Sequence, residues 1–289
     1  MITVYIGAGL ANRMFQYAFA LKLKALGYNV DIDEHSFEPR YDFEKLKLRD
    51  VFENIALNES NPSNFKYVIS DSFFAKLYRR VSEFIPDHRY IERWNLKYDP
   101  QIFEKATNHC IYVGFWISYK YFEDCKNDIF SAFCFKEFAN DRNLKIMKEI
   151  NETESVSVHF RKNVDYLKNL PKACPPDYYY KSISEIKRRV KNPKFYFFSD
   201  NWDWVRENIK GVDYIPIDWN PSSGPESYCD MQLMSYCKHN IIANSTYSWW
   251  AAYLNNNQTK IVCSPYDWFN KMDIDDVVPN EWLKEKIDF

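Results

Sequence analysis

Short apolar runs alternate regularly with amphipathic stretches from residue 154 to the end of the chain. Five runs have the length of buried strands, at residues 155–160, 194–199, 212–217, 240–243 and 260–264. Helical spacing of apolar residues lies between them, at residues 178–190, 201–209, 227–237 and 249–255. Strands that alternate with helices predict an α/β fold with a parallel sheet covered on both faces.

The N-terminal part begins with the same kind of unit. Residues 2–6 predict a strand, residues 7–12 a turn and residues 13–26 a helix, followed by a second strand at 28–33. Residues 36–140 are rich in aromatic and charged side chains, and only 111–116 stands out there as a further strand. With 289 residues, the chain has the length of two modest α/β domains.

Composition narrows the class of protein. The 38 basic and 40 acidic residues leave a net charge of −2, which argues against a nucleic-acid partner. No apolar run approaches the roughly 20 residues of a membrane span, and the first residues carry no basic leader, so export is not expected. Seven cysteines without a Cys-x-x-Cys pair indicate reduced thiols in a cytoplasmic protein.

Chemistry-bearing residues follow three of the predicted strands. If those strands are parallel, the loops after them share one edge of the sheet, where α/β proteins bind ligands. The candidates are His159, Arg161 and Lys162, then Ser199 and Asp200, then Asn244, Ser245, Thr246 and Ser248. A guanidinium fork and a hydroxyl-rich helix start both suit phosphate, and a carboxylate suits guanine or ribose. The combination predicts a site for a nucleoside diphosphate.

Each residue alone also has a purely structural interpretation. Arg161 could be a surface ion-pair residue, His159 a buried core histidine, and Asp200 an ordinary helix cap. Ser245, Thr246 and Ser248 could equally be caps. Only their coincidence on one predicted sheet edge favours a binding site over these alternatives.

Three other functions remain open on the sequence. Gly7-Ala8-Gly9 after a first strand suggests a dinucleotide oxidoreductase, but Asn12 stands where that fingerprint requires glycine or alanine. Asp31-Ile-Asp33 and Asp273-Ile-Asp275 have the spacing of a metal-dependent sugar transferase. Nine tryptophans and 22 tyrosines would also suit a non-catalytic glycan-binding protein.

At these residues the chain resembles the bacterial α-1,2-fucosyltransferases of glycosyltransferase family 11. That family ends a strand with His-x-Arg-Arg-x-Asp and carries a later Asn-Ser-[Thr/Ser]-[Phe/Tyr]-Ser-Trp-Trp run, which residues 244–250 match fully. Its Gly-Leu-Gly-Asn-Gln-Met-Phe-Gln-Tyr segment corresponds to residues 9–17, where Ala11 and Arg13 depart from the pattern. Lys162 replaces the second arginine, and Asp165 comes one residue late.

The resemblance implies a GT-B-like fold of two Rossmann-like domains facing across a cleft. Residues 1–150 would be the acceptor-side domain and residues 151–289 the GDP-sugar-binding domain. L-Fucose would pass from GDP-β-L-fucose, with inversion, to the 2-hydroxyl of a terminal galactose-type acceptor in a surface polysaccharide or oligosaccharide. The resemblance implies no cofactor, no obligatory metal and no nucleic acid. It implies a cytoplasmic enzyme, peripheral on the inner membrane.

The resemblance also assigns roles to single residues. Arg161, His159 and Asp165 would be catalytic, with Arg161 on the β-phosphate and His159 and Asp200 at the guanosine end. The donor would be bound by Lys162, Ser199, Asp200, Asn244, Ser245, Thr246 and Ser248. Gly9, Asn12 and Gln16 would line the acceptor side. The base that deprotonates the acceptor stays open among Asp33, Glu34, His35 and Asp165.

Overall fold

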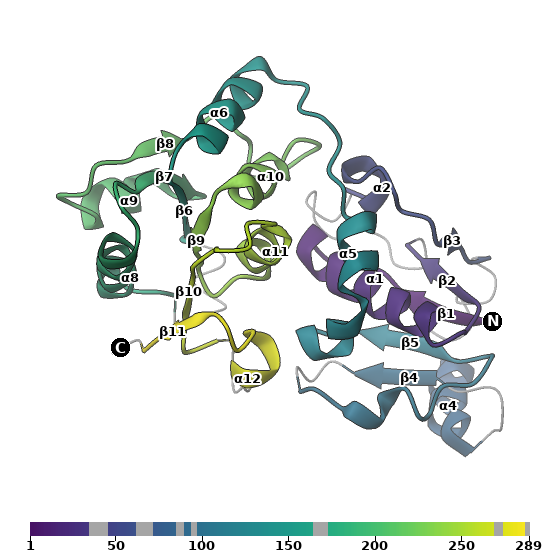
Figure 1. Cartoon of the computed structure of the whole chain (residues 1–289). Helices are drawn as coiled ribbons and strands as arrows, with labels where there is room; N and C mark the ends of the chain where they lie inside the picture. Colours follow the sequence, from purple (N-terminus) through teal and green to yellow (C-terminus); the bar gives the residue numbers. More distant parts are fainter. Residues whose placement is uncertain are drawn as a thin grey trace. The chain divides into compact units, whose positions relative to one another are not determined.

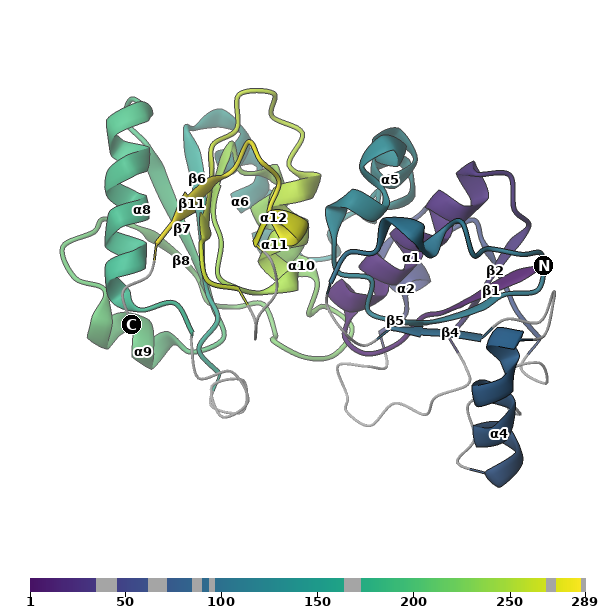
Figure 2. The ribbon, with the colours of Figure 1, turned by 90° about the horizontal axis from the view of Figure 1, so that it is seen from below.

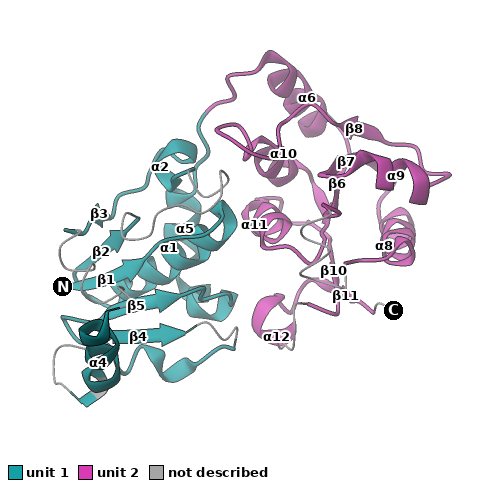
Figure 3. Ribbon diagram, turned by 180° about the vertical axis from the view of Figure 1, so that it is seen from behind, with its two compact units in different colours: residues 1–136 teal, residues 137–289 magenta. Residues whose placement is uncertain are grey.

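The computed structural model describes residues 1–34, 46–61, 72–84, 90–93, 97–163, 173–268 and 274–286. The chain forms two compact units, unit 1 (residues 1–136) and unit 2 (residues 137–289), coloured separately in Figure 3. The boundary expected at residue 150 falls inside α6 (Asp141–Glu152), which belongs to unit 2.

Unit 1 is a parallel sheet in the order β3-β2-β1-β5-β4. Its elements are β1 (Ile2–Tyr5), α1 (Leu10–Ala25), β2 (Val30–Asp33), α2 (Leu48–Val51), β3 (Asn58–Glu59), α4 (Phe73–Val81), β4 (Tyr90–Arg93), β5 (Ile111–Gly114) and α5 (Lys126–Ala132), with short 3₁₀ turns at Ser82–Phe84, Pro100–Ile102, Tyr119–Tyr121 and Glu123–Cys125. Helices α1 and α5 lie on one face of the sheet and α4 on the other (Figure 2).

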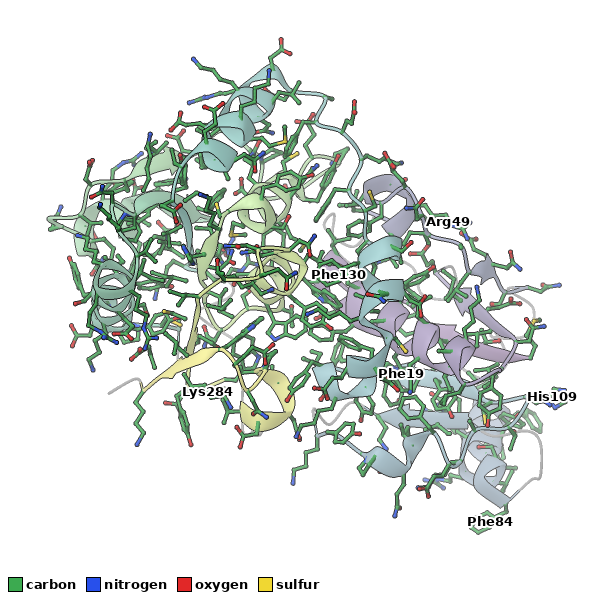
Figure 4. The ribbon with its side chains drawn as sticks, in the orientation of Figure 1. Phe19, Arg49, Phe84, His109, Phe130 and Lys284 are labelled. Carbon is green, nitrogen blue, oxygen red and sulfur yellow. The ribbon has the colours of Figure 1, made fainter. Side chains whose placement is uncertain are left out.

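Aromatic side chains fill the core between α1 and this sheet. Phe19, labelled in Figure 4, stacks on Trp116 with ring centroids 4.3 Å apart. Tyr112 and Tyr121 meet the Phe19 ring edge-on, at centroid distances of 5.2 and 5.5 Å. Because Tyr119, Tyr121 and Phe122 are buried, they are core residues and not an exposed platform for a sugar.

Unit 2 is a six-stranded parallel sheet in the order β11-β10-β9-β6-β7-β8, which is the strand order of a doubly wound Rossmann fold. Its elements after α6 are β6 (Ser155–Phe160), α8 (Pro176–Arg189), β7 (Lys194–Ser199), α9 (Trp202–Asn208), β8 (Ile215–Ile217), α10 (Cys229–Tyr236), β9 (His239–Ile241), α11 (Thr246–Leu254), β10 (Val262–Pro265), α12 (Ile274–Val277) and β11 (Leu283–Glu285). Helices α8 and α9 cover one face, and α6, α10 and α11 cover the other (Figure 1).

The two faces of this sheet are closed by apolar packing and by a few buried hydroxyl bonds. Val156, Val158 and Phe160 of β6 are fully buried, as expected for a central parallel strand. Tyr178 of α8 donates its hydroxyl to the carbonyls of Ile242 and Cys263, at 2.6 and 3.0 Å, which ties the helix to the ends of β9 and β10. These bonds fix the carboxyl edge of the sheet.

Two further sequence expectations concern thiols and membrane spans. All seven cysteines lie within the described residues and are free thiols, of which Cys134 is exposed. Among the described helices, none combines the length and apolar character needed to cross a bilayer.

Candidate active site

The site in unit 2 lies where the order of the strands reverses. Strands β6 and β9 are neighbours and pair in parallel, with Val156 opposite His239. From β6 the chain continues to β7 on one side, whereas from β9 it continues to β10 on the other. The loops after these two strands diverge at the carboxyl edge of the sheet, which is the usual ligand position in doubly wound folds. Arg161 follows β6, and the start of α11 follows β9.

Arg161 and Asp200 form an ion pair across this edge. Nη1 of Arg161 lies 2.8 Å from Oδ2 of Asp200; the arginine side chain is 35% exposed and the aspartate side chain 5%. The other oxygen of Asp200, Oδ1, accepts the backbone N–H of Lys162 at 2.6 Å. The carboxylate therefore holds the loop after β6 and orients a guanidinium that remains accessible to a ligand.

Lys162 points into the protein. Its side chain is buried, its Nζ donates to the carbonyl of Cys174, and Nζ lies 4.1 Å from the centre of the Trp204 ring. Burial lowers the pKa of Lys162 to about 8. Asn201 caps α9 by accepting the N–H of Trp204 and also donates to the carbonyl of Lys162 at 3.1 Å. These bonds show that Lys162 stabilises the loop after β6. The sequence had instead suggested a direct contact between Lys162 and the nucleotide sugar.

His159 is a neutral histidine with one ring nitrogen that lacks a hydrogen-bond partner. Its ring is buried, its centroid lies 5.7 Å from that of Tyr247, and Nδ1 has no hydrogen-bond partner among the described residues. Burial, followed by the positive charge of Arg161, lowers the pKa of His159 to about 3. An imidazole of this pKa suits hydrogen bonding to a ligand and not proton removal at neutral pH.

The start of α11 is a tightly capped helix N-terminus. The hydroxyl of Ser245 accepts the N–H of Tyr247 at 3.4 Å, and the hydroxyl of Ser248 donates to the carbonyls of Ala243 and Ser245. Thr246 is half-buried in the first turn. The Ser248 hydroxyl is thus used inside the helix, so the anion attraction of this segment comes from the helix dipole and its backbone N–H groups.

The residues around this helix start have supporting contacts. Asn244 is buried, and its Oδ1 lies 3.5 Å from the Cys174 thiol that donates to it. Ser199 accepts the N–H of Asn201 at 3.0 Å at the end of β7. Trp249 and Trp250 are fully buried, and the indole N–H of Trp249 donates to the carbonyl of Val277 at 2.8 Å. Both tryptophans therefore pack in the interior behind the start of α11 and stabilise it.

Tyr247 and Asp230 belong to the same region but were not selected from the sequence. The Tyr247 hydroxyl accepts the N–H of Met231 and donates to the carbonyl of Ser227, both at 2.8 Å, and so joins the starts of α10 and α11. Asp230, in the first turn of α10, accepts the side-chain N–H of Asn220 at 2.8 Å. Burial raises the pKa of Asp230 to about 7. The sequence could have indicated Asp230 by its position at the start of the expected helix 227–237.

In unit 1, Gln16 holds the loop between β1 and α1. Its Oε1 accepts the N–H of Gly7 at 2.7 Å, and its Nε2 donates to the carbonyl of Gly114 at 2.8 Å. The side chain is completely buried, so the geometry supports a structural role and no direct contact with an acceptor. Gly9 and Asn12 are half-buried at the start of α1 and remain on the rim of this loop.

Arg13 anchors the same loop to the end of β2. Its Nε donates to the carbonyl of Ala8 at 2.9 Å, and its Nη1 lies 3.1 Å from Oε1 of Glu34. Ala8 has a φ of 65°, in the left-handed region that favours glycine, so the loop needs such an anchor. The side chains of Asp33 and Glu34 are buried, and Oε2 of Glu34 has no hydrogen-bond partner among the described residues; His35 and Asp165 lie outside the described residues.

Residues 1–286 match the family model described as glycosyl transferase family 11. The chain belongs to glycosyl transferase family 11. It is 27% identical to an α-1,2-colitosyltransferase of Escherichia coli, over 98% of each chain, and 28% identical to the O-antigen biosynthesis glycosyltransferase WbnK of Escherichia coli, over 96% of this chain and 98% of the relative. Galactoside α-(1,2)-fucosyltransferase 1 of Ateles belzebuth is 24% identical over half of this chain and 43% of its own length.

Solved structures show the fold of this family 11 glycosyltransferase. A mutant of Arabidopsis thaliana FUT1 in complex with GDP superposes with a TM-score of 0.57 at 13% identity, covering 94% of this chain and 72% of that one. NodZ α-1,6-fucosyltransferase soaked with GDP-fucose gives a TM-score of 0.52 at 15% identity, over 88% and 91% of the two chains. With the two parallel sheets, these likenesses confirm the GT-B-like α/β fold class.

Proposed function

We propose that this glycosyltransferase transfers L-fucose from GDP-β-L-fucose to the 2-hydroxyl of a terminal galactose-type acceptor. Family membership and the α-1,2 linkage named for two kinds of relative support the reaction. The solved structures that share the fold include fucosyltransferases bound to GDP or soaked with GDP-fucose, which supports the donor. The observation that carries the proposal is the accessible Arg161 guanidinium beside the α11 N-terminus, at the switch point of a Rossmann sheet.

Departure of GDP builds negative charge on the β-phosphate, and the site offers two positive groups for it. Arg161 supplies a full charge, and the first turn of α11 supplies backbone N–H groups and the positive end of the helix dipole. Groups arranged in advance for a developing charge are usually the largest contribution to catalysis. Both would act in a single displacement with inversion, without an obligatory metal.

The hydrogen bonds within the protein suggest roles for the other residues of the site. Oδ1 of Asp200 accepts the N–H of Lys162, whereas Oδ2 pairs with Arg161 by charge and has no hydrogen-bond partner among the described residues. Its proposed role is to aim the arginine. His159 keeps an unsatisfied Nδ1 and a neutral ring, which fits a hydrogen bond to the guanosine part of the donor. Asp165 remains the proposed acceptor base, on its charge and its place after Arg161.

A second candidate donor sugar is colitose, because the α-1,2-colitosyltransferase relative aligns over 98% of both chains. Colitose is L-fucose without the 3-hydroxyl, so the same phosphate site would serve either nucleotide sugar. A site built to hydrogen-bond that hydroxyl rejects the deoxy sugar strongly, whereas an apolar pocket discriminates weakly. The ratio of kcat/KM for GDP-fucose and GDP-colitose therefore separates the two candidates.

The first experiment is thermal unfolding in EDTA with GDP, UDP, ADP or NAD. A ligand at 100 times its Kd stabilises the folded state by about 2.7 kcal/mol, so GDP alone should raise Tm by several degrees. Transfer from GDP-fucose to a β-galactoside should then continue in EDTA, with the 1,2 linkage identified by NMR of the product. A response to UDP or NAD in place of GDP, or a loss of turnover restored by Mn²⁺, would overturn the proposal.

A further inference from the structure

Helix α4 and the turn that follows it carry a concentrated patch of exposed apolar side chains. The patch, named here the α4 stripe, consists of Phe73, Phe74, Leu77, Val81 and Phe84, which are 74%, 80%, 47%, 39% and 83% exposed. These are five of the nine exposed large apolar side chains of the described residues, within only twelve positions. Scattered apolar residues are normal on a protein surface, but a contiguous patch marks an interaction site.

The opposite side of α4 is anchored to unit 1. Ala75 is 2% exposed, and Tyr78 packs against the cluster of Tyr5, Tyr90 and Val113 on the sheet. At 3.6 residues per turn, Phe73, Leu77 and Val81 lie above one another on a different side of the helix. The stripe therefore does not contribute to the core of its own unit.

The views of the structure agree with this division. Figure 2 shows α4 extending away from the sheet of unit 1, on the face opposite α1. Phe84, labelled in Figure 4, lies at the outer end of this segment with its ring beyond the ribbon. The exposed rings are thus carried on a projecting helix, where a flat surface can reach all of them.

Positive charge borders the α4 stripe. The helix contains Lys76, Arg79 and Arg80 and no acidic residue between Phe73 and Val81. Lys76 and Arg80 are exposed and stand one turn apart, and Arg80 follows Phe73 by two turns, so both cations lie beside the apolar side chains. An amphipathic helix with aromatic residues on one side and lysine or arginine on the next is typical of helices that lie in a membrane interface.

We propose that the α4 stripe docks unit 1 on an anionic lipid bilayer, with Phe73 and Phe74 inserted at the headgroup boundary and Arg80 and Lys76 on the lipid phosphates. Pairing with a second copy of α4 is disfavoured because it would bring the exposed Lys76 and Arg80 side chains of two copies together. The surface is distinct from the Arg161 site of unit 2, and the inference does not depend on the donor or acceptor. It provides a physical basis for the peripheral membrane association expected from the sequence.

The test is co-sedimentation of the full chain with phosphatidylcholine vesicles, with and without phosphatidylglycerol. The wild type should bind only the vesicles that contain phosphatidylglycerol. F73S/F74S should bind roughly tenfold more weakly or not at all, from the lost apolar insertion. R80Q should bind the vesicles that contain phosphatidylglycerol about fivefold more weakly, because one basic residue contributes about that factor at an anionic surface. Since all three side chains are exposed, CD spectra and Tm should match the wild type.

A matched pair of leucines provides the control. Leu77→Ser in the stripe and Leu26→Ser at the end of α1 change side chains of nearly equal exposure, 47% and 45%. Only the Leu77 substitution should weaken vesicle binding. Equal binding by F73S/F74S and the wild type would overturn the proposal, as would failure of the wild type to bind either vesicle. Self-association abolished by F73S/F74S, without vesicle binding, would assign the stripe to a second copy of the chain instead.

Discussion

Arg161 and Asp200 are joined across the carboxyl edge of the second sheet, with Nη1 and Oδ2 2.8 Å apart, although they follow different strands. The parallel register of β6 and β7 places Phe160 opposite Ser199, and each strand then continues by one residue into the pair. The ion pair is therefore formed by protein groups alone. A guanidinium that is already oriented needs little reorganisation when charge develops on a leaving phosphate.

Arg161→Ala is expected to lower kcat/KM for transfer by about 10²–10³-fold, because it removes the full charge that we propose to face the leaving phosphate. The fold should persist but Tm should fall, because the Asp200 carboxylate, whose side chain is only 5% exposed, keeps the N–H of Lys162 and loses its cation. Steady-state kinetics and thermal unfolding measure the two effects. Arg206→Ala, which breaks an exposed ion pair with Asp203 on α9, is the matched control and should leave transfer unchanged.

Gln16→Ala should destabilise unit 1 although the residue lies next to a proposed substrate loop. The substitution leaves the N–H of Gly7 and the carbonyl of Gly114 without partners, and each such loss costs about 1–3 kcal/mol. Urea unfolding should show that the free energy of unfolding falls by about 2–6 kcal/mol. Gln16→Glu keeps the acceptor for Gly7 but places a fully buried carboxylate against the carbonyl of Gly114, so it should be at least as destabilising. Unchanged stability in Gln16→Ala would show that these two bonds are not structural.

The sequence predicted unit 2 well because β6 and β7 are central strands whose apolar residues are buried. β6 and β7 have the predicted bounds, and β8, β9 and β10 lie within or one residue beyond the predicted runs. The elements that the pattern missed are edge strands with mixed or charged residues. β3 has two residues, and β11 includes Lys284 and Glu285, so neither has an apolar run to reveal it.

The meeting of Arg161 and Asp200 was predictable, but the direction of individual side chains was not. Parallel strands bring Arg161 and Asp200 to one edge, which follows from topology alone. Whether Lys162 faces a ligand or the interior depends on the Cys174 carbonyl and the Trp204 ring, which no local pattern indicates. Gln16 likewise depends on Gly114, 98 residues away.

Arg13→Gln should be strongly destabilising, because it leaves the carboxylate of Glu34 buried without its cation. Breaking one side of a buried ion pair typically costs about 3–5 kcal/mol. The double variant R13Q/E34Q removes both charges and should recover most of that loss, measured as a coupling energy in a double-mutant cycle. Strictly additive single and double effects would mean that the pair does not act as a unit. Transfer by the double variant reports whether the loop at Ala8 keeps its shape.

Asp230→Asn should change how stability depends on pH. Burial raises the pKa of Asp230 to about 7 in the folded state, whereas an unfolded aspartate titrates near 3.9. Between these values the folded state binds more protons, so this residue makes stability fall as pH rises from about 4 through 7 and contributes no slope above that. Asparagine has no such titration and can keep the acceptor for Asn220. The Tm of D230N relative to the wild type should therefore be higher at pH 8 than at pH 5.

Asp203→Asn changes an exposed position on α9 and is the control. It should show the same dependence of Tm on pH as the wild type. Parallel Tm profiles for D230N and the wild type would contradict the raised pKa and would leave Asp230 as an ordinary residue of the first turn of α10.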